Sequence, residues 1–375
     1  MLSPKIPKGA TQRVAPTAIP QTFFDQVAAN CQVASAGQAG QFSLCGTLLR
    51  LRQLYKWEHG LPPWREPEPA QVIEWIEGQE RAWEALEGAA WQQLVWDGQT
   101  FDPLAVAELN ERLIPAGFAY GAGLSRGHAP TCFLGELQEL RRRDGLTILI
   151  LGPELARDLD AAPALRQGSL IYARRQAWGF YLWDRLSDPT MQNNGFMKAA
   201  LEVYGFDLSG LLRTTEAHQE KFEAFLTGEL EAVIHHEVGE ALEPSLGPAF
   251  AHLLDLFPQT RVELWLRALK DALAEVNDWG RLAYLIEGRR LASLAVMLAL
   301  RPPLYSMLMP ELEPAYCRLQ NNGDWGPLDA ARLQILARLR LVAGELQDLL
   351  ARPESAAPEW LLAEIQQRYL APLGL

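Results

Sequence analysis

The chain has 375 residues, of which 49% are hydrophobic and 21% are charged, and its formal net charge at pH 7 is −12. This composition is typical of globular proteins, and a length well above that of one ordinary domain predicts two domains. Because acidic residues outnumber basic ones, the chain lacks the cationic surface that general nucleic-acid binding requires, and we expect no nucleic-acid partner.

The cysteines and the apolar stretches predict a cytoplasmic protein without a membrane partner. The four cysteines lie far apart and form no CxxC pair, which argues against a thiolate zinc site and a disulfide framework. Residues 1–20 contain prolines and basic side chains but no apolar stretch of signal-peptide length, and we expect a flexible N-terminal segment there. The apolar stretch Leu291–Leu300 is too short to span a bilayer and predicts a buried helix.

Apolar residues recur at helical spacing in two early stretches, residues 42–58 and 72–94, and each stretch predicts an amphipathic helix. The second helix is expected to end before the turn signal Asp97-Gly98. A third helix is predicted to begin at Asp102, which can cap it, with Pro103 in the first turn.

The pattern changes between about residues 117 and 173, where we expect a small β-sheet. The run Leu146–Leu151 is short, apolar and partly β-branched, and Asp144-Gly145 just before it is a hairpin signal. Residues 169–173 are expected to join the sheet. The first half of the chain is therefore predicted to be an α+β domain over residues 21–189, with helices and a small sheet insertion.

Helical patterns return at Arg174 and continue to the end of the chain. Pro189 and the turn signal Asn193-Asn194-Gly195 mark the expected domain boundary. We therefore predict an all-helical domain over residues 190–375 and a mostly α fold class for the whole chain.

One run of residues, His235 to Glu240, concentrates possible chemistry on a predicted helix over residues 226–243. At about 100° per residue, Glu237 falls inside the apolar arc of this helix, whereas His236 and Glu240 lie together on its flank and His235 is turned to the other side. An unpaired charge is costly to bury, so Glu237 must be paired, protonated or bound to a cation.

An imidazole and a carboxylate one helical turn apart can ligate the same metal ion. We expect His236 and Glu240 to bind iron, manganese or zinc, and Glu237 to act as a third ligand or as the catalytic general base. The run departs from the zinc motif HExxH because a second histidine is missing at the required spacing. Other helices must therefore complete the site.

Further ligands could come from His59, Glu80 and Glu87, which extend the apolar faces of the two early helices. Ordinary interpretations stay open for all three, because long acidic side chains can reach solvent from the edge of an apolar stripe and His59 can be a simple loop residue. Glu237 could likewise form a structural ion pair with an arginine, for example Arg52.

A second charged pattern occurs later in the chain, where Glu263, Arg267 and Asp271 are spaced by four residues. They fall away from the apolar face of their predicted helix and indicate a surface ladder of ion pairs.

Several segments together resemble an uncharacterised two-domain bacterial family of unknown function. The resemblance implies the two-part architecture and no activity. It is carried by Leu48–Arg52, Tyr55–Trp64, Phe133–Leu137 and His236–Glu240.

Two functions follow from the residues. The first is a metal-dependent enzyme, an iron or manganese oxidoreductase acting on a small molecule, with His236 and Glu240 as ligands and Glu237 as ligand or base. The second is a non-catalytic helical interaction or scaffold protein that binds a protein partner through its Trp-rich loop, residues 57–64, and holds Glu237 in a structural ion pair.

Overall fold

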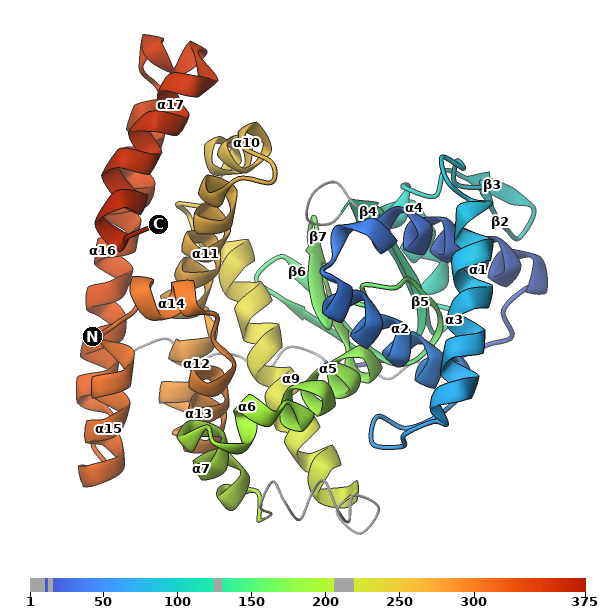
Figure 1. Ribbon diagram of the computed structural model, residues 1–375, viewed down its shortest axis with the longest axis horizontal. Helices are drawn as coiled ribbons and strands as arrows, with labels where there is room; N and C mark the ends of the chain where they lie inside the picture. The colour runs from blue at the N-terminus through green and yellow to red at the C-terminus, as the bar shows by residue number, and fades with distance from the viewer. Residues whose placement is uncertain (1–10, 13–15, 125–129, 206–218) are drawn as a thin grey trace. The chain divides into compact units, whose positions relative to one another are not determined.

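The computed structural model describes residues 11–12, 16–124, 130–205 and 219–375. The chain divides into two compact units, residues 1–188 and 189–375 (Figure 1). The N-terminal segment that we expect to be flexible lies for the most part outside the described residues.

The first unit is built around a six-stranded sheet in the order β1-β5-β6-β8-β7, with β4 also paired to β5. All of these pairs are antiparallel except β6 with β8, which is parallel. The strands are β1 (Thr11–Gln12), β4 (Phe118–Leu124), β5 (Pro130–Arg143), β6 (Leu146–Arg157), β7 (Ala164–Gln167) and β8 (Leu170–Arg174).

The predicted hairpin at Asp144-Gly145 is confirmed. Arg143 pairs with Leu146 in the β5–β6 register, and both turn residues have positive φ, 51° and 78°, as a two-residue hairpin turn requires. The sheet is nevertheless larger than the small insertion that we expected. Its strands β5 and β6 have 14 and 12 residues and supply much of the core of this unit, because their side chains are buried along most of their length.

Helix α1 packs against β5 and β6, α4 against β4 and α5 against β6, whereas a second hairpin, β2–β3, packs on α1. The buried residues of α1, Phe23, Val27, Cys31 and Ala34, join the main core together with the strands. The elements are α1 (Gln21–Gln38), η1 (Ala39–Gln41), α2 (Leu44–Glu58), α3 (Pro69–Glu84), β2 (Leu94–Trp96), β3 (Gln99–Phe101), α4 (Val106–Leu113) and α5 (Arg175–Ser187).

The predicted helix over residues 72–94 is wrong in its second half. Helix α3 ends at Glu84, and Leu94 begins strand β2. The Asp97-Gly98 pair, with φ of 48° and 75°, is the turn of the β2–β3 hairpin rather than the end of a helix. Local turn chemistry therefore outweighed the helical spacing of the apolar residues. The third helix also begins later than expected, at Val106.

The described part of the second unit is helical, as predicted. Its helices are α6 (Pro189–Gln192), α7 (Gly195–Val203), α9 (Gln219–Leu242), α10 (Pro248–Leu256), α11 (Arg261–Val276), α12 (Arg281–Glu287), α13 (Leu291–Leu300), α14 (Pro303–Leu308), α15 (Leu312–Asn322), α16 (Gly326–Leu350), η4 (Pro353–Ala356), α17 (Pro358–Ile365), η5 (Gln366–Leu370) and η6 (Ala371–Leu373). Among the described residues, no helix combines the length and apolar character that crossing a membrane requires.

Candidate functional site

Helices α9 and α11 of the second unit approach each other closely at Gly239. A Cβ atom at this position would lie 2.2 Å from the backbone oxygen of Ala274, so only glycine allows the observed spacing. The Asn277 side chain also donates a hydrogen bond to the backbone oxygen of Gly239 at 2.8 Å. Glycine is unfavourable inside a helix, and its presence in the middle of α9 is explained by this contact.

The close approach brings His236 and Glu240 of α9 beside Asp271 of α11. Each of these residues offers one ligand atom, and the three atoms lie within 4.8 Å of one another. All three side chains are partly accessible to solvent. When two ligand atoms each lie about 2.1 Å from the same metal ion, they are at most about 4.2 Å from each other. The three ligand atoms would therefore have to move only slightly closer together to bind one metal ion.

His236 is oriented by Glu275, one turn further along α11. Its Nδ1 lies 3.0 Å from Oε1 of Glu275, and Arg281 holds the same carboxylate through a hydrogen bond from Nε at 2.7 Å and a second one from Nη2. Burial by itself lowers the pKa of His236, but the negative charge of Glu275 and the hydrogen bond to it outweigh burial and raise this pKa to about 9. The other ring nitrogen, Nε2, does not contact Glu275, and it must lose its proton before it can bind a metal ion.

Glu275 is the most strongly held acid of this region. Burial by itself would raise its pKa, but Arg281 and His236 overcome burial and lower the pKa to about 2. Glu275 is thus a fixed negative charge behind the imidazole of His236.

A lysine and a tyrosine contact the two carboxylates of the cluster. Nζ of Lys270 lies 2.5 Å from Oε2 of Glu240 and 3.5 Å from Oδ1 of Asp271. The Tyr305 hydroxyl donates a hydrogen bond of 2.7 Å to Oδ2 of Asp271. Lys270 therefore supplies a positive charge next to the same oxygens that could bind a metal ion.

Glu237 lies on the buried face of α9, with 8% of its surface exposed. Burial raises its pKa to about 7, and the neighbouring charges of His236 and Lys270 offset only part of this effect. Within the described residues, no hydrogen bond to its carboxyl group is found. A carboxyl group with a pKa near neutrality can both accept and donate a proton, which suits a general base or acid.

The other predicted site residues lie elsewhere. His235 stacks on Tyr284 with ring centroids 4.0 Å apart. His59 lies just after α2 in the first unit, and Glu80 and Glu87 are exposed there. Arg52 pairs with Glu66 and with Asp184, both in the first unit, so those two carboxylates are its partners.

The sequence predicts a surface ladder on α11 and does not identify Lys270, Asp271 or Glu275 as residues of the site. Arg267 does pair with Glu263 at 2.7 Å, but Glu263 is buried, and Asp271 contacts Tyr305 and Lys270 instead of continuing a surface ladder. A signal was present, because Glu275 interrupts the apolar stretch Ala272–Val276 in the same way as Glu237 interrupts the buried face of α9.

Comparison with known proteins finds matches to the two domains of one family. The model for the N-terminal domain of a family of unknown function, DUF6866, matches residues 22–174, and the model for its C-terminal domain matches residues 179–368. No curated protein and no solved structure matches the chain.

Proposed function

The chain belongs to the two-domain family of unknown function DUF6866, and since this family name carries no activity, we propose a function from the helical site alone: a divalent-metal-dependent enzyme. The ligands are His236, Glu240 and Asp271. The observation that carries the proposal is the convergence of their three ligand atoms within 4.8 Å. In this proposal Asp271 is the third ligand, and Glu237 acts as the general base.

The surroundings of His236 support this assignment. A metal-bound histidine commonly donates its second ring N–H to a carboxylate, which fixes the ring and increases the basicity of the ligating nitrogen. Glu275 provides this carboxylate at 3.0 Å, and Arg281 fixes Glu275 in turn. Glu275 therefore holds the ring through Nδ1 and leaves Nε2 as the nitrogen that would bind the metal ion.

The donor set favours manganese or iron over softer ions. One imidazole and two carboxylates suit Mn²⁺ and Fe²⁺, and three protein ligands leave coordination positions open for water or substrate. Zn²⁺ accepts the same donors and is the competing ion. An open Mn²⁺ or Fe²⁺ site next to an acid–base group such as Glu237 is consistent with an oxidoreductase acting on a small molecule.

A second candidate function is favoured by Lys270. Its ammonium group contacts both Glu240 and Asp271 and offsets part of their charge, as in a structural ion-pair network of a non-catalytic interaction or scaffold protein. The two functions differ in whether a metal ion can displace the Lys270 ammonium group from the carboxylates of Glu240 and Asp271.

Metal titration of untagged, chelator-treated protein tests the proposal. Under anaerobic conditions, we expect the wild type to bind about one Mn²⁺ or Fe²⁺ per chain by calorimetry, and His236→Ala and Asp271→Asn each to abolish this binding. Asp255→Asn, at an exposed position of α10, is the matched control and should bind as the wild type does. A folded wild type that binds no Mn²⁺, Fe²⁺ or Zn²⁺ would refute the metal function.

Lys270→Met separates the two candidates. If a metal ion competes with the ammonium group, removing it should increase metal affinity by about tenfold, since one unit of repelling charge is lost. If the network is purely structural, the variant should bind no metal and should only lose stability, by about 1–3 kcal/mol, because two partly buried carboxylates lose a hydrogen-bonding cation.

A further inference from the structure

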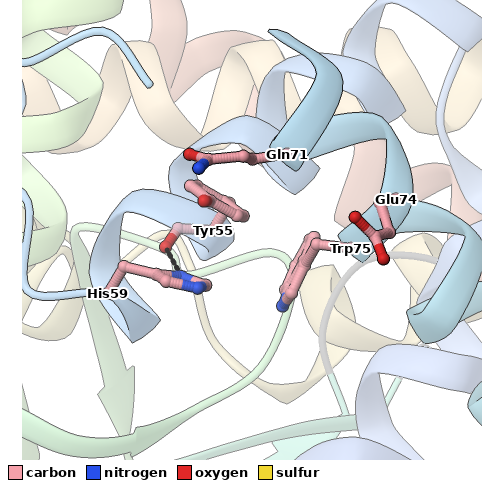
Figure 2. Close-up of a pocket in the computed structure, with 5 residues that line it drawn as sticks. All are labelled: Tyr55, His59, Gln71, Glu74 and Trp75. Carbon is pink, nitrogen blue, oxygen red and sulfur yellow. Dashed lines mark hydrogen bonds between the residues drawn. The ribbon is translucent and has the colours of Figure 1, made fainter. Parts of the chain in front are cut away.

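The first unit contains an open, solvent-accessible cavity between the end of α2 and the start of α3, separate in sequence from the residues of the helical site. It has a volume of about 420 Å³ and is lined by Tyr55, His59, Gln71, Glu74 and Trp75 (Figure 2). This volume lies at the small end of the range for small-molecule sites, roughly 300–1,000 Å³.

Three aromatic rings form the walls of this cavity. Tyr55 and His59 are stacked, with centroids 4.0 Å apart and an interplanar angle of 19°. Trp75 stands edge-on to Tyr55 with centroids 5.5 Å apart. Figure 2 shows His59 and Trp75 on opposite sides of an open space, with the edge of the His59 ring toward Trp75. The indole nitrogen of Trp75 is buried, so this ring meets a ligand through carbon atoms and its π-system.

Polar groups around the rings lack partners. Tyr55 is largely buried, with 6% of its surface exposed, and its hydroxyl has no hydrogen bond to any described residue and is reached by solvent. The carboxylate of Glu74 likewise forms no ion pair within the described ranges. Nδ1 of His59 lies 2.9 Å from the backbone oxygen of Tyr55, which can only accept, so Nδ1 carries a hydrogen and Nε2 of the neutral ring is an acceptor.

We propose that this cavity binds a small molecule through a guanidinium group. The flat cation lies against the Trp75 ring, the Glu74 carboxylate balances its charge, and His59 Nε2 and the Tyr55 hydroxyl accept its N–H groups. Guanidinium combines a planar face that stacks on aromatic rings with five N–H donors, and it is always charged.

Other cations satisfy fewer of these groups. A quaternary ammonium ion has no N–H to offer to His59, Tyr55 or Glu74. A primary ammonium ion has three donors but no flat face to lie against Trp75. An anion would meet the unpaired carboxylate of Glu74 and is disfavoured by like charge.

Calorimetric titration with three compounds of matched shape tests the proposal: butylguanidine, its neutral planar analogue butylurea, and butylamine. We expect butylguanidine to bind one site per chain and the other two to bind at least about tenfold more weakly. Metal-site variants such as His236→Ala should bind butylguanidine as the wild type does, so this test stands apart from that of the metal site.

Variants locate the binding in the cavity. Glu74→Gln should weaken butylguanidine binding about fivefold, the size of an exposed ion pair, whereas Glu77→Gln, at an exposed position on the same helix outside the cavity, should leave it unchanged. Trp75→Leu should weaken it about tenfold. Because Trp75 also packs against a core cluster, the exposed His59→Ala is the second variant if Trp75→Leu does not fold.

Three results would overturn the proposal. They are absence of butylguanidine binding at millimolar concentration, equal binding of butylurea, and wild-type affinity in Glu74→Gln.

Discussion

Nδ1 of His236 on α9 and Oε1 of Glu275 on α11 are 3.0 Å apart, and this hydrogen bond connects the two helices at the helical site. Glu275 is buried and is also held by Arg281, so it cannot turn away from the imidazole. The orientation of the His236 ring is thus determined by a residue on another helix.

Glu275→Gln should lower metal affinity by about 10- to 100-fold, the usual cost of removing a carboxylate that orients a metal-bound histidine. The amide keeps the size of the side chain but removes its charge, so the imidazole loses basicity and the ring loses its fixed orientation. Metal affinity is measured by calorimetry with Mn²⁺.

The control is Glu243→Gln in the same unit. Glu243 is also buried and is held by Arg340 through two bonds of 2.9 Å, so its variant tests the general effect of breaking a buried ion pair. It should lose stability while binding metal like the wild type. Equal metal affinity in both variants would show that Glu275 does not support a metal ligand.

Gly239→Ala should destabilise the protein by about 1–3 kcal/mol, because the new Cβ would collide with the backbone oxygen of Ala274 and push α9 away from α11. The variant should also bind metal more weakly, since His236 and Glu240 would move away from Asp271. Urea denaturation gives the stability.

Gly344→Ala is the matched control, because Gly344 also lies inside a helix, α16, but nothing lies within 4 Å of its hypothetical Cβ. Alanine there should stabilise the protein by about 0.5–1 kcal/mol. A neutral effect of Gly239→Ala on both stability and metal affinity would mean that the close helix contact does not hold the site together.

Glu229 should make stability depend on pH. Burial raises its pKa, and hydrogen bonds from the hydroxyls of Ser293 at 2.7 Å and Tyr204 at 3.1 Å offset only part of this increase. The folded state therefore binds the proton more tightly than the unfolded chain. This stabilisation is complete below the unfolded pKa of about 4.5 and is lost as the pH rises through the raised pKa of the folded state.

Glu229→Gln should remove this part of the pH dependence and increase stability at pH 8 by about 1 kcal/mol. Both hydroxyls bond to Oε1, and the amide oxygen of glutamine can accept both bonds. Urea denaturation at several pH values, with the exposed Glu220→Gln on the same helix as control, measures the effect. An unchanged pH slope in Glu229→Gln would contradict the prediction.

The sequence was most informative where short-range chemistry decides the structure. The Asp144-Gly145 hairpin was predicted because two adjacent residues with positive φ select that turn. Asp97-Gly98 carries the same signal, but the apolar spacing before it resembles a helical face and predicts the end of a helix, where the structure has a hairpin turn. The register of the six-stranded sheet involves pairs such as Phe133 with Arg157, which no local pattern specifies.

On the helical site, the sequence by itself determined which face of α9 each residue occupies, because a helix of fixed period converts spacing into direction. It therefore placed Glu237 inside the buried face and His236 beside Glu240. Only the tertiary structure decided that Asp271, Lys270 and Glu275 are their neighbours. These contacts join residues 30 or more positions apart, and they exist because Gly239 lets two helices approach at one point, which spacing along a single helix cannot specify.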